Sequence, residues 1–258
     1  MKVAYQSISL KNTVAEIVRT PNMLLVFLFL FCTGVISLTL MRFSGSLMRN
    51  FLLSIVTISL TLYQNGYSIS YAQRVYLFSQ AGFPSLFDWK NHLRRGLGKI
   101  IILIILFAVS VLLLLVPEIL LTSVFSIGWD GLFARILALV PAVILSAFWW
   151  IAYVYSDEVF FRHKSLIHKN FMQCAKALIV IILIEMSLVF FTQINNELIR
   201  ALTPLSAALF IALQSLWRAV GLLLVGNLLG QSARMVYTQT DSAELPMRTD
   251  GVFEGEQH

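Results

Sequence analysis

Two ionisable residues lie deep inside apolar stretches of this sequence. Glu185 lies within the stretch Ala177–Ile194, and Arg218 lies within the stretch Pro204–Gly230. If both stretches cross a membrane, each charge costs about 2.5–3.5 kcal/mol at the bilayer centre on insertion scales. An ion pair lowers that cost, and Gln214 precedes Arg218 by one helical turn on the same face. The spacing therefore predicts an intramembrane polar pair of Glu185 and Arg218, with Gln214 beside it.

Three interpretations of these charges stay open at the level of the sequence. The pair belongs to a polar pathway or substrate site, or it is a buried ion pair that fixes how two helices pack. In the third interpretation the last apolar helix spans only Pro204–Leu223, so that Arg218 reaches the cytoplasmic headgroups. The three differ in whether Glu185 and Arg218 need each other.

Enzyme motifs are missing where a membrane enzyme would need them. The sequence contains no phosphate-binding loop, no nucleophile elbow and no paired-histidine metal motif. His163 and His168 are five residues apart, which is the wrong spacing for one helical face to hold a metal. Asp157 and Glu158 precede them, but a solvated run of charges explains such a group better than a metal site does. We therefore expect no catalytic residue, no metal ligand and no cofactor.

The composition defines the class of protein that carries these residues. Hydrophobic residues make up 58% of the chain and charged residues only 12%, against roughly 45–50% and about 25% in soluble domains. Crossing a bilayer takes about 20 mostly apolar residues. The chain offers six such windows, at Met23–Met41, Phe51–Ser70, Gly98–Val116, Leu132–Trp150, Ala177–Ile194 and within Pro204–Gly230. The sequence thus predicts an all-α integral membrane protein with six transmembrane helices.

The lysines and arginines predict how these helices are oriented. Fourteen of the 19 basic residues fall on one side of the six-helix arrangement and four on the other. Cytoplasmic loops carry the excess of basic residues, so we expect both termini in the cytoplasm and the protein in the cell membrane. The predicted organisation is a cytoplasmic segment 1–22, which can form an interfacial helix, a transmembrane domain 23–235 and an acidic disordered tail 236–258.

Two basic segments on the predicted cytoplasmic side form a candidate surface for lipid or protein partners. The net charge of +6 is carried largely at helix ends, where anionic headgroups attract each cation by about 1 kcal/mol. In the first segment a short interfacial helix is expected to start at Ser85, after a break at Gly82 and Pro84, and to lead through Gly96 and Gly98 into the next span. The candidate surface comprises Trp89, Lys90, Arg94, Arg95, Arg162, Lys164 and Lys169. We expect membrane lipids and membrane proteins as partners, and no nucleic acid.

The two basic segments also resemble each other. A gapless alignment at an offset of 79 residues places Lys90 and Asn91 on Lys169 and Asn170. Each segment then follows a helix with an aromatic end and precedes an apolar helix. Either an internal repeat or the common residue types of membrane helices account for the match.

The region Asn65–Pro117 carries a resemblance to a known family. A Gly-Tyr pair at a helix end, a basic step, a Phe-Pro turn followed by Asp-Trp, and a Gly-Leu start to the next apolar helix occur here at Gly66, Tyr67, Arg74, Phe83, Pro84, Asp88, Trp89, Gly96 and Leu97. In these positions the chain resembles the domain of unknown function 4013 family of multi-pass membrane proteins. The resemblance implies a multi-pass membrane fold and brings no activity or ligand with it.

Function follows from these expectations only as a choice between classes. The favoured interpretation is a non-catalytic polytopic membrane protein that acts as a subunit or scaffold of a membrane complex. The alternatives are a permease-type component of an ATP-driven transporter whose ATPase is a separate chain, and a lipid-handling membrane protein with a groove containing Glu185 and Arg218.

Overall fold

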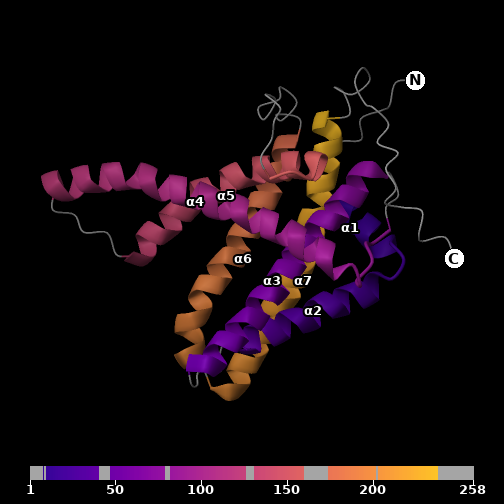
Figure 1. Ribbon diagram of the computed structural model, residues 1–258, viewed down its shortest axis with the longest axis horizontal. Helices are drawn as coiled ribbons and strands as arrows, with labels where there is room; N and C mark the ends of the chain where they lie inside the picture. The colour runs from indigo at the N-terminus through magenta and orange to yellow at the C-terminus, as the bar shows by residue number, and fades with distance from the viewer. Residues whose placement is uncertain are drawn as a thin grey trace.

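The protein is all helical over the residues that the structure describes. The structure is a computed structural model and describes residue 8 and residues 10–40, 47–78, 82–125, 131–159, 174–201 and 203–237. They form seven helices, α1 (Leu10–Arg19), α2 (Met23–Leu40), α3 (Leu47–Leu77), α4 (Trp89–Phe125), α5 (Gly131–Ser156), α6 (Ala175–Ala201) and α7 (Pro204–Tyr237) (Figure 1). The predicted all-α class is confirmed.

Four segments of these helices are long and apolar enough to cross a membrane, over the part of the chain that the structure describes. They are Met23–Leu40, Trp89–Leu113, Leu139–Ser156 and Pro204–Tyr237. The count of six is therefore wrong by this measure. The apolar run of α3 is interrupted by polar side chains such as Gln64 and Asn65, and side chains of α6 are described only over residues 175–191, fewer than the 18 such a span needs.

The expected short interfacial helix is not a separate element. Gly82 to Asp88 form a turn, and α4 runs from Trp89 to Phe125 as one helix without a break at Gly96 or Gly98. The break at Gly82 and Pro84 is confirmed, but helix formation starts four residues later than Ser85.

The two glycines of α4 serve close packing and do not bend the helix. A Cβ atom added at Gly96 would lie within 3.0 Å of the carbonyl oxygen of Leu62 on α3, and one at Gly66 would lie within 3.0 Å of that of His92 on α4. At Gly98 it would meet the Tyr153 hydroxyl of α5 within 3.0 Å. Small residues let helix backbones approach this closely, so α3 and α4 cross in backbone contact.

Helix α3 also packs directly on α7. A Cβ atom at Gly226 would lie 2.7 Å from the carbonyl oxygen of Ser68, and one at Gly230 within 3.0 Å of that of Ala72. Ser68 donates a hydrogen bond to the carbonyl oxygen of Leu222 at 2.8 Å. Helix α3 touches α2, α4, α5 and α7, and α7 touches α1, α2, α3, α5 and α6, so α3 and α7 together form the centre of the bundle.

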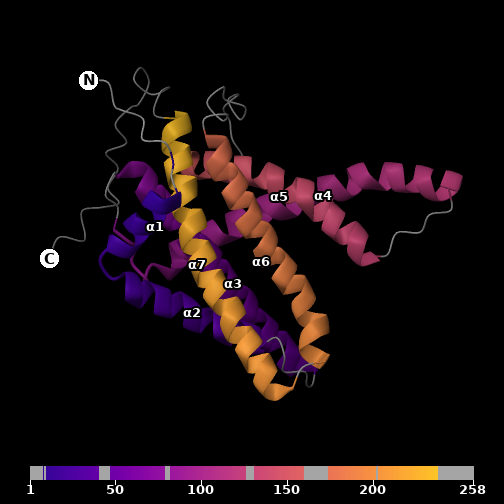
Figure 2. The same cartoon turned by 180° about the vertical axis from the view of Figure 1, so that it is seen from behind.

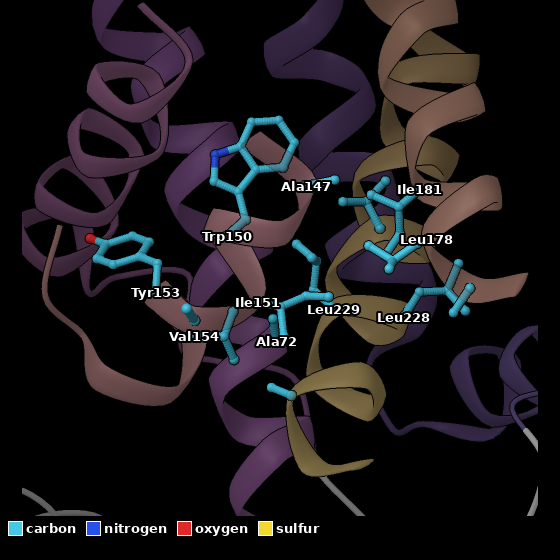
Figure 3. Close-up of a cluster of buried hydrophobic side chains, with 14 of the residues drawn as sticks. Ala72, Ala147, Trp150, Ile151, Tyr153, Val154, Leu178, Ile181, Leu228 and Leu229 are labelled. Carbon is cyan, nitrogen blue, oxygen red and sulfur yellow. The ribbon is translucent and has the colours of Figure 1, made fainter. Parts of the chain in front are cut away.

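The main apolar core lies where α5, α6 and α7 meet α3. Figure 3 shows Trp150 and Ile151 of α5 near Leu178 and Ile181 of α6, with Leu229 of α7 among them. All five side chains are buried. This core therefore ties the end of α5 to the start of α6.

Part of the molecule lies away from this core. The second half of α4 and the first half of α5 extend from the bundle as a pair, seen from both sides in Figure 1 and Figure 2. We call this pair, residues 107–125 and 131–145, the α4–α5 arm. Its exposed apolar side chains include Val109, Leu112, Leu113 and Leu145.

The first helix lies on the end of the last. Thr13 and Ile17 of α1 are buried, and Gln231 of α7 donates hydrogen bonds to Glu16 Oε2 at 3.2 Å and to Thr13 Oγ1 at 3.4 Å. Next to these buried residues α1 exposes Leu10, Val14 and Val18. A helix thus forms within the predicted segment 1–22, whereas the predicted acidic tail lies outside the described residues after Tyr237.

Candidate functional site

Glu185 is a buried charge, as its place in the sequence predicts, but its partner is Lys99. Lys99 Nζ of α4 lies 2.5 Å from Glu185 Oε1 of α6, and the two side chains are only 3% and 10% exposed. Since α4 begins at Trp89, Lys99 lies three turns inside the helix and not at its mouth. The ion pair therefore links α4 to α6 inside the bundle.

Trp150 of α5 completes the surroundings of this lysine. Lys99 Nζ lies over the Trp150 ring, 4.6 Å from its centroid, a geometry in which the ring quadrupole attracts the ammonium group. The Trp150 indole N–H donates to the backbone carbonyl oxygen of Lys99 at 3.2 Å. The Lys99 ammonium of α4 is thus held by a carboxylate of α6 and an aromatic face of α5.

The predicted direct pair of Glu185 and Arg218 is not formed. Arg218 is close enough to Glu185 to interact with it electrostatically, but in the described part of the chain no ion pair within 4.0 Å joins them. The carboxylate is already engaged with Lys99, whose side chain reaches it from α4. The sequence suggested Arg218 because α6 and α7 are consecutive helices. A third helix, α4, can still reach the same carboxylate, and it supplies Lys99.

Gln214 and Arg218 share one face of α7 and differ in burial. Gln214 is buried, and its Oε1 atom has no hydrogen-bond partner within the described ranges. Arg218 is partly buried. Close by, the indole N–H of Trp217 donates to Ser187 Oγ of α6 at 2.8 Å, which keeps α6 against α7 at this level.

A second polar region holds the turn Gly82–Asp88 against α3 and α4. Four consecutive carbonyl oxygens of the turn accept side-chain hydrogen bonds. The pairs are Arg74 Nη1 to Phe83 at 3.3 Å, Tyr67 Oη to Pro84 at 3.2 Å, His92 Nε2 to Ser85 at 2.8 Å and Tyr63 Oη to Leu86 at 2.7 Å. Three of the donors come from α3, so these hydrogen bonds hold the turn against that helix. We call this arrangement the turn clamp.

His92 is the member of the turn clamp that α4 contributes, and it is almost fully buried. Because a carbonyl oxygen only accepts, His92 Nε2 carries the proton that it shares with Ser85. Nδ1 then accepts from the Ser70 hydroxyl at 2.9 Å. That hydroxyl in turn accepts from Arg95 Nη1 at 3.1 Å, so the imidazole is one link in a continuous chain of hydrogen bonds.

Asp157 ends this chain just after α5. It accepts hydrogen bonds from Gln73 Nε2 at 2.9 Å, from Arg94 Nη2 at 2.7 Å and from Arg95 Nε at 3.3 Å. Its backbone φ of 54° lies in the left-handed region, which Asp and Asn tolerate better than most residues. Asp157 therefore ends α5 and joins α3, α4 and α5 in one charged cluster.

The candidate lipid or partner surface divides into two kinds of residue. Trp89 and Lys90 are exposed, with Lys90 Nζ 5.9 Å from the Trp89 ring centroid, and the neighbouring Phe87 is 91% exposed. Arg94 and Arg95 instead face Asp157. Arg162, Lys164 and Lys169 lie outside the described residues.

The sequence analysis did not single out Lys99 or His92, which are buried. It considered Asp157 only as part of a solvated run of charges, whereas the structure pairs Asp157 with Arg94 and Arg95. A signal was available in the helical spacing, since Arg95 and Lys99 are four residues apart and lie on one face once α4 begins at Trp89. No group of three or more His, Cys, Asp or Glu suited to a metal ion occurs among the described residues.

Comparisons with protein-family models, curated proteins and solved structures found no match. The resemblance of residues 65–117 to a family of membrane proteins therefore stays a prediction, and function has to be argued from the geometry above.

Proposed function

We propose that this chain is a non-catalytic subunit or scaffold of a larger assembly in the cell membrane. The observation that carries the proposal is the α4–α5 arm, which extends from the bundle with apolar side chains that its own chain leaves uncovered (Figure 2). Association of membrane helices depends on close packing, because lipid tails are as apolar as leucine. A helix pair that leaves its own bundle is therefore available to pack against the helices of a partner membrane protein.

The proposal includes both termini in the cytoplasm. The hydrogen bonds from Gln231 to Thr13 and Glu16 support a common side for the two ends, because they join the first helix to the last turns of α7. The excess of basic residues on that side supports the cytoplasm.

Photo-crosslinking tests the role of the arm. A photoreactive phenylalanine derivative placed at Leu112 should give discrete protein adducts in native membranes, whereas one placed at Leu183 or Leu213 should give lipid adducts only. All three side chains are 64% exposed, so exposure is matched and only the location differs. An adduct of twice the chain mass would identify a second copy as the partner. Lipid adducts alone at Leu112 would overturn the proposal.

A permease-type transport component is the second candidate. It is favoured by the buried charges of α4 and α6, Lys99 and Glu185, because ionisable residues inside a bundle often mark a path for a solute. A separate ATPase would have to supply the energy. Purification in mild detergent followed by mass spectrometry separates the two candidates, since a stoichiometric ATPase favours the permease and its absence favours the non-catalytic subunit.

A further inference from the structure

Arg218 is a partly buried charge of the bundle whose guanidinium group interacts with Glu185 only at a distance. Among the described residues, its guanidinium group forms no ion pair within 4.0 Å and no hydrogen bond. The group carries five N–H donors in a rigid fork. It belongs to α7, a candidate membrane span. In the hydrocarbon core of a bilayer, neither water nor a lipid headgroup is available to accept its hydrogen bonds.

The neighbouring charges do not cancel that of Arg218. Glu185 is the only acidic side chain described near it, and its carboxylate forms a 2.5 Å ion pair with Lys99. Lys99, Glu185 and Arg218 together therefore carry one net positive charge. Such an excess inside a membrane protein favours the binding of one negative group.

Gln214 supplies a second unsatisfied group on the same face of α7. It lies one turn before Arg218 and is 7% exposed, and its Oε1 atom has no partner in the described part of the chain. Rotation of the amide about its terminal bond exchanges the oxygen and the NH₂ group, which are assigned from their hydrogen bonds. The amide can therefore offer an N–H donor one helical turn from the guanidinium group on the same face of α7.

The lipid side of α7 gives a route to these two residues. Leu213, Leu216 and Trp217 are exposed, and they alternate with Gln214 and Arg218 along two turns of the helix. A ligand with an apolar chain can lie against the exposed side chains while its head group reaches the partly buried Arg218.

We propose that Arg218 and Gln214 form an intramembrane binding site for a carboxylate or phosphate group. The guanidinium donates two parallel hydrogen bonds to two oxygens of the anion, the arrangement in which arginine binds such groups best. The Gln214 amide donates a third. The site is independent of the proposed partner contacts of the α4–α5 arm, which lies on other helices.

Thermal unfolding of the purified protein in a neutral detergent tests the site. Oleate and phosphatidic acid should raise the melting temperature in a saturable way, and the uncharged analogues oleyl alcohol and diacylglycerol should not. Inorganic phosphate and acetate form the water-soluble arm of the titration. A shift with the amphiphiles alone assigns the site to membrane lipids, and a shift with inorganic phosphate or acetate assigns it to a soluble anion.

The variants define the residues. Arg218→Gln should weaken apparent anion affinity about tenfold or more, as expected when charge-assisted hydrogen bonds are lost. Lys176→Gln, which removes an exposed cation of α6, should leave affinity unchanged. If Arg218→Gln fails to fold, Arg218→Lys serves as the second variant, because it retains the charge. It should also weaken binding, because lysine lacks the planar fork of donors. Equal shifts with charged and uncharged amphiphiles, or anion binding unaffected by either Arg218 variant, would overturn the site.

Discussion

The α3–α4 crossing and the α7 segment 214–218 both place polar side chains inside the bundle, but they use them differently. At the crossing, the donors of Tyr63, Tyr67 and His92 each meet a carbonyl oxygen of the turn clamp. On α7, Gln214 Oε1 has no partner within the described ranges. Arg218 forms no ion pair there.

This difference separates polar groups whose hydrogen bonds stabilise the fold from Gln214 and Arg218, which are available to bind a ligand. A satisfied buried hydrogen bond adds about 0.5–1.5 kcal/mol, while a buried polar atom without a partner costs about 1–3 kcal/mol. Substitutions at the crossing should therefore change stability strongly. Substitutions at Gln214 and Arg218 should change ligand binding more than stability.

The largest effect is expected at the glycine contact of the crossing. Gly66→Ala and Gly96→Ala each place a methyl group within 3.0 Å of a backbone oxygen of the facing helix. Neither backbone can move without separating α3 from α4, so we expect a loss of about 3 kcal/mol or more. The yield of monodisperse protein and its melting temperature measure the loss. Gly82→Ala is the matched control, because no atom lies within 4 Å of its added methyl group.

An effect of similar size concerns the buried ion pair. Lys99→Gln or Glu185→Gln alone leaves an unpaired charge in the interior and should cost about 3–5 kcal/mol, whereas the double variant should recover much of that loss. A double-mutant cycle on melting temperatures measures the coupling. The cycle between Glu185 and Arg218 should give a smaller coupling. Additive effects for Lys99 and Glu185 would contradict the assigned pair.

A smaller effect is expected from one bond of the turn clamp. Tyr67→Phe removes the only hydroxyl that reaches the Pro84 carbonyl oxygen among the described contacts, and it should lower stability by about 1 kcal/mol. Limited proteolysis should then cut the turn Gly82–Asp88 faster than in the unchanged protein. Phe87→Leu, at a side chain that is almost fully exposed, should leave both measurements unchanged.

The smallest effect on stability is expected at the exposed cation Lys90. Lys90→Gln should change stability by less than about 0.5 kcal/mol, because the side chain contacts only the exposed Trp89 ring in the described structure. It should reduce the amount of anionic lipid that co-purifies, measured by mass spectrometry. Arg94→Gln should lower the melting temperature more, since Arg94 is paired with Asp157. Equal effects of the two variants would remove the distinction between a lipid-facing and a structural cation.

Composition and apolar runs were sufficient to predict an all-helical chain with several candidate membrane spans, because such spans are defined by length and apolar composition. The break at Gly82 and Pro84 was also predictable, since those residues disfavour helices locally. The start of α4 was not. Gly96 and Gly98 are compatible with a bend or with a close approach of another backbone, and only the position of Leu62 and Tyr153 decides between these.

The candidate site likewise has one part that the sequence predicts and one part that it does not. That Glu185 needs a partner follows from its apolar surroundings, which the sequence displays. Which cation reaches it depends on how α4 passes α6, and Lys99 is 86 residues away along the chain. Because Glu185 pairs with Lys99, Arg218 forms no ion pair within the described residues. This could not be predicted before the partner of Glu185 was known.

Helix α4 runs unbroken from the crossing with α3 to the tip of the α4–α5 arm. From the crossing at Gly96 to Phe125 the helix measures about 44 Å at 1.5 Å per residue. A rotation of about 5° at that crossing would displace the far end by roughly 4 Å, most of a helical turn. The tip of the arm is therefore the part of α4 whose position depends most on how the helix packs at the crossing.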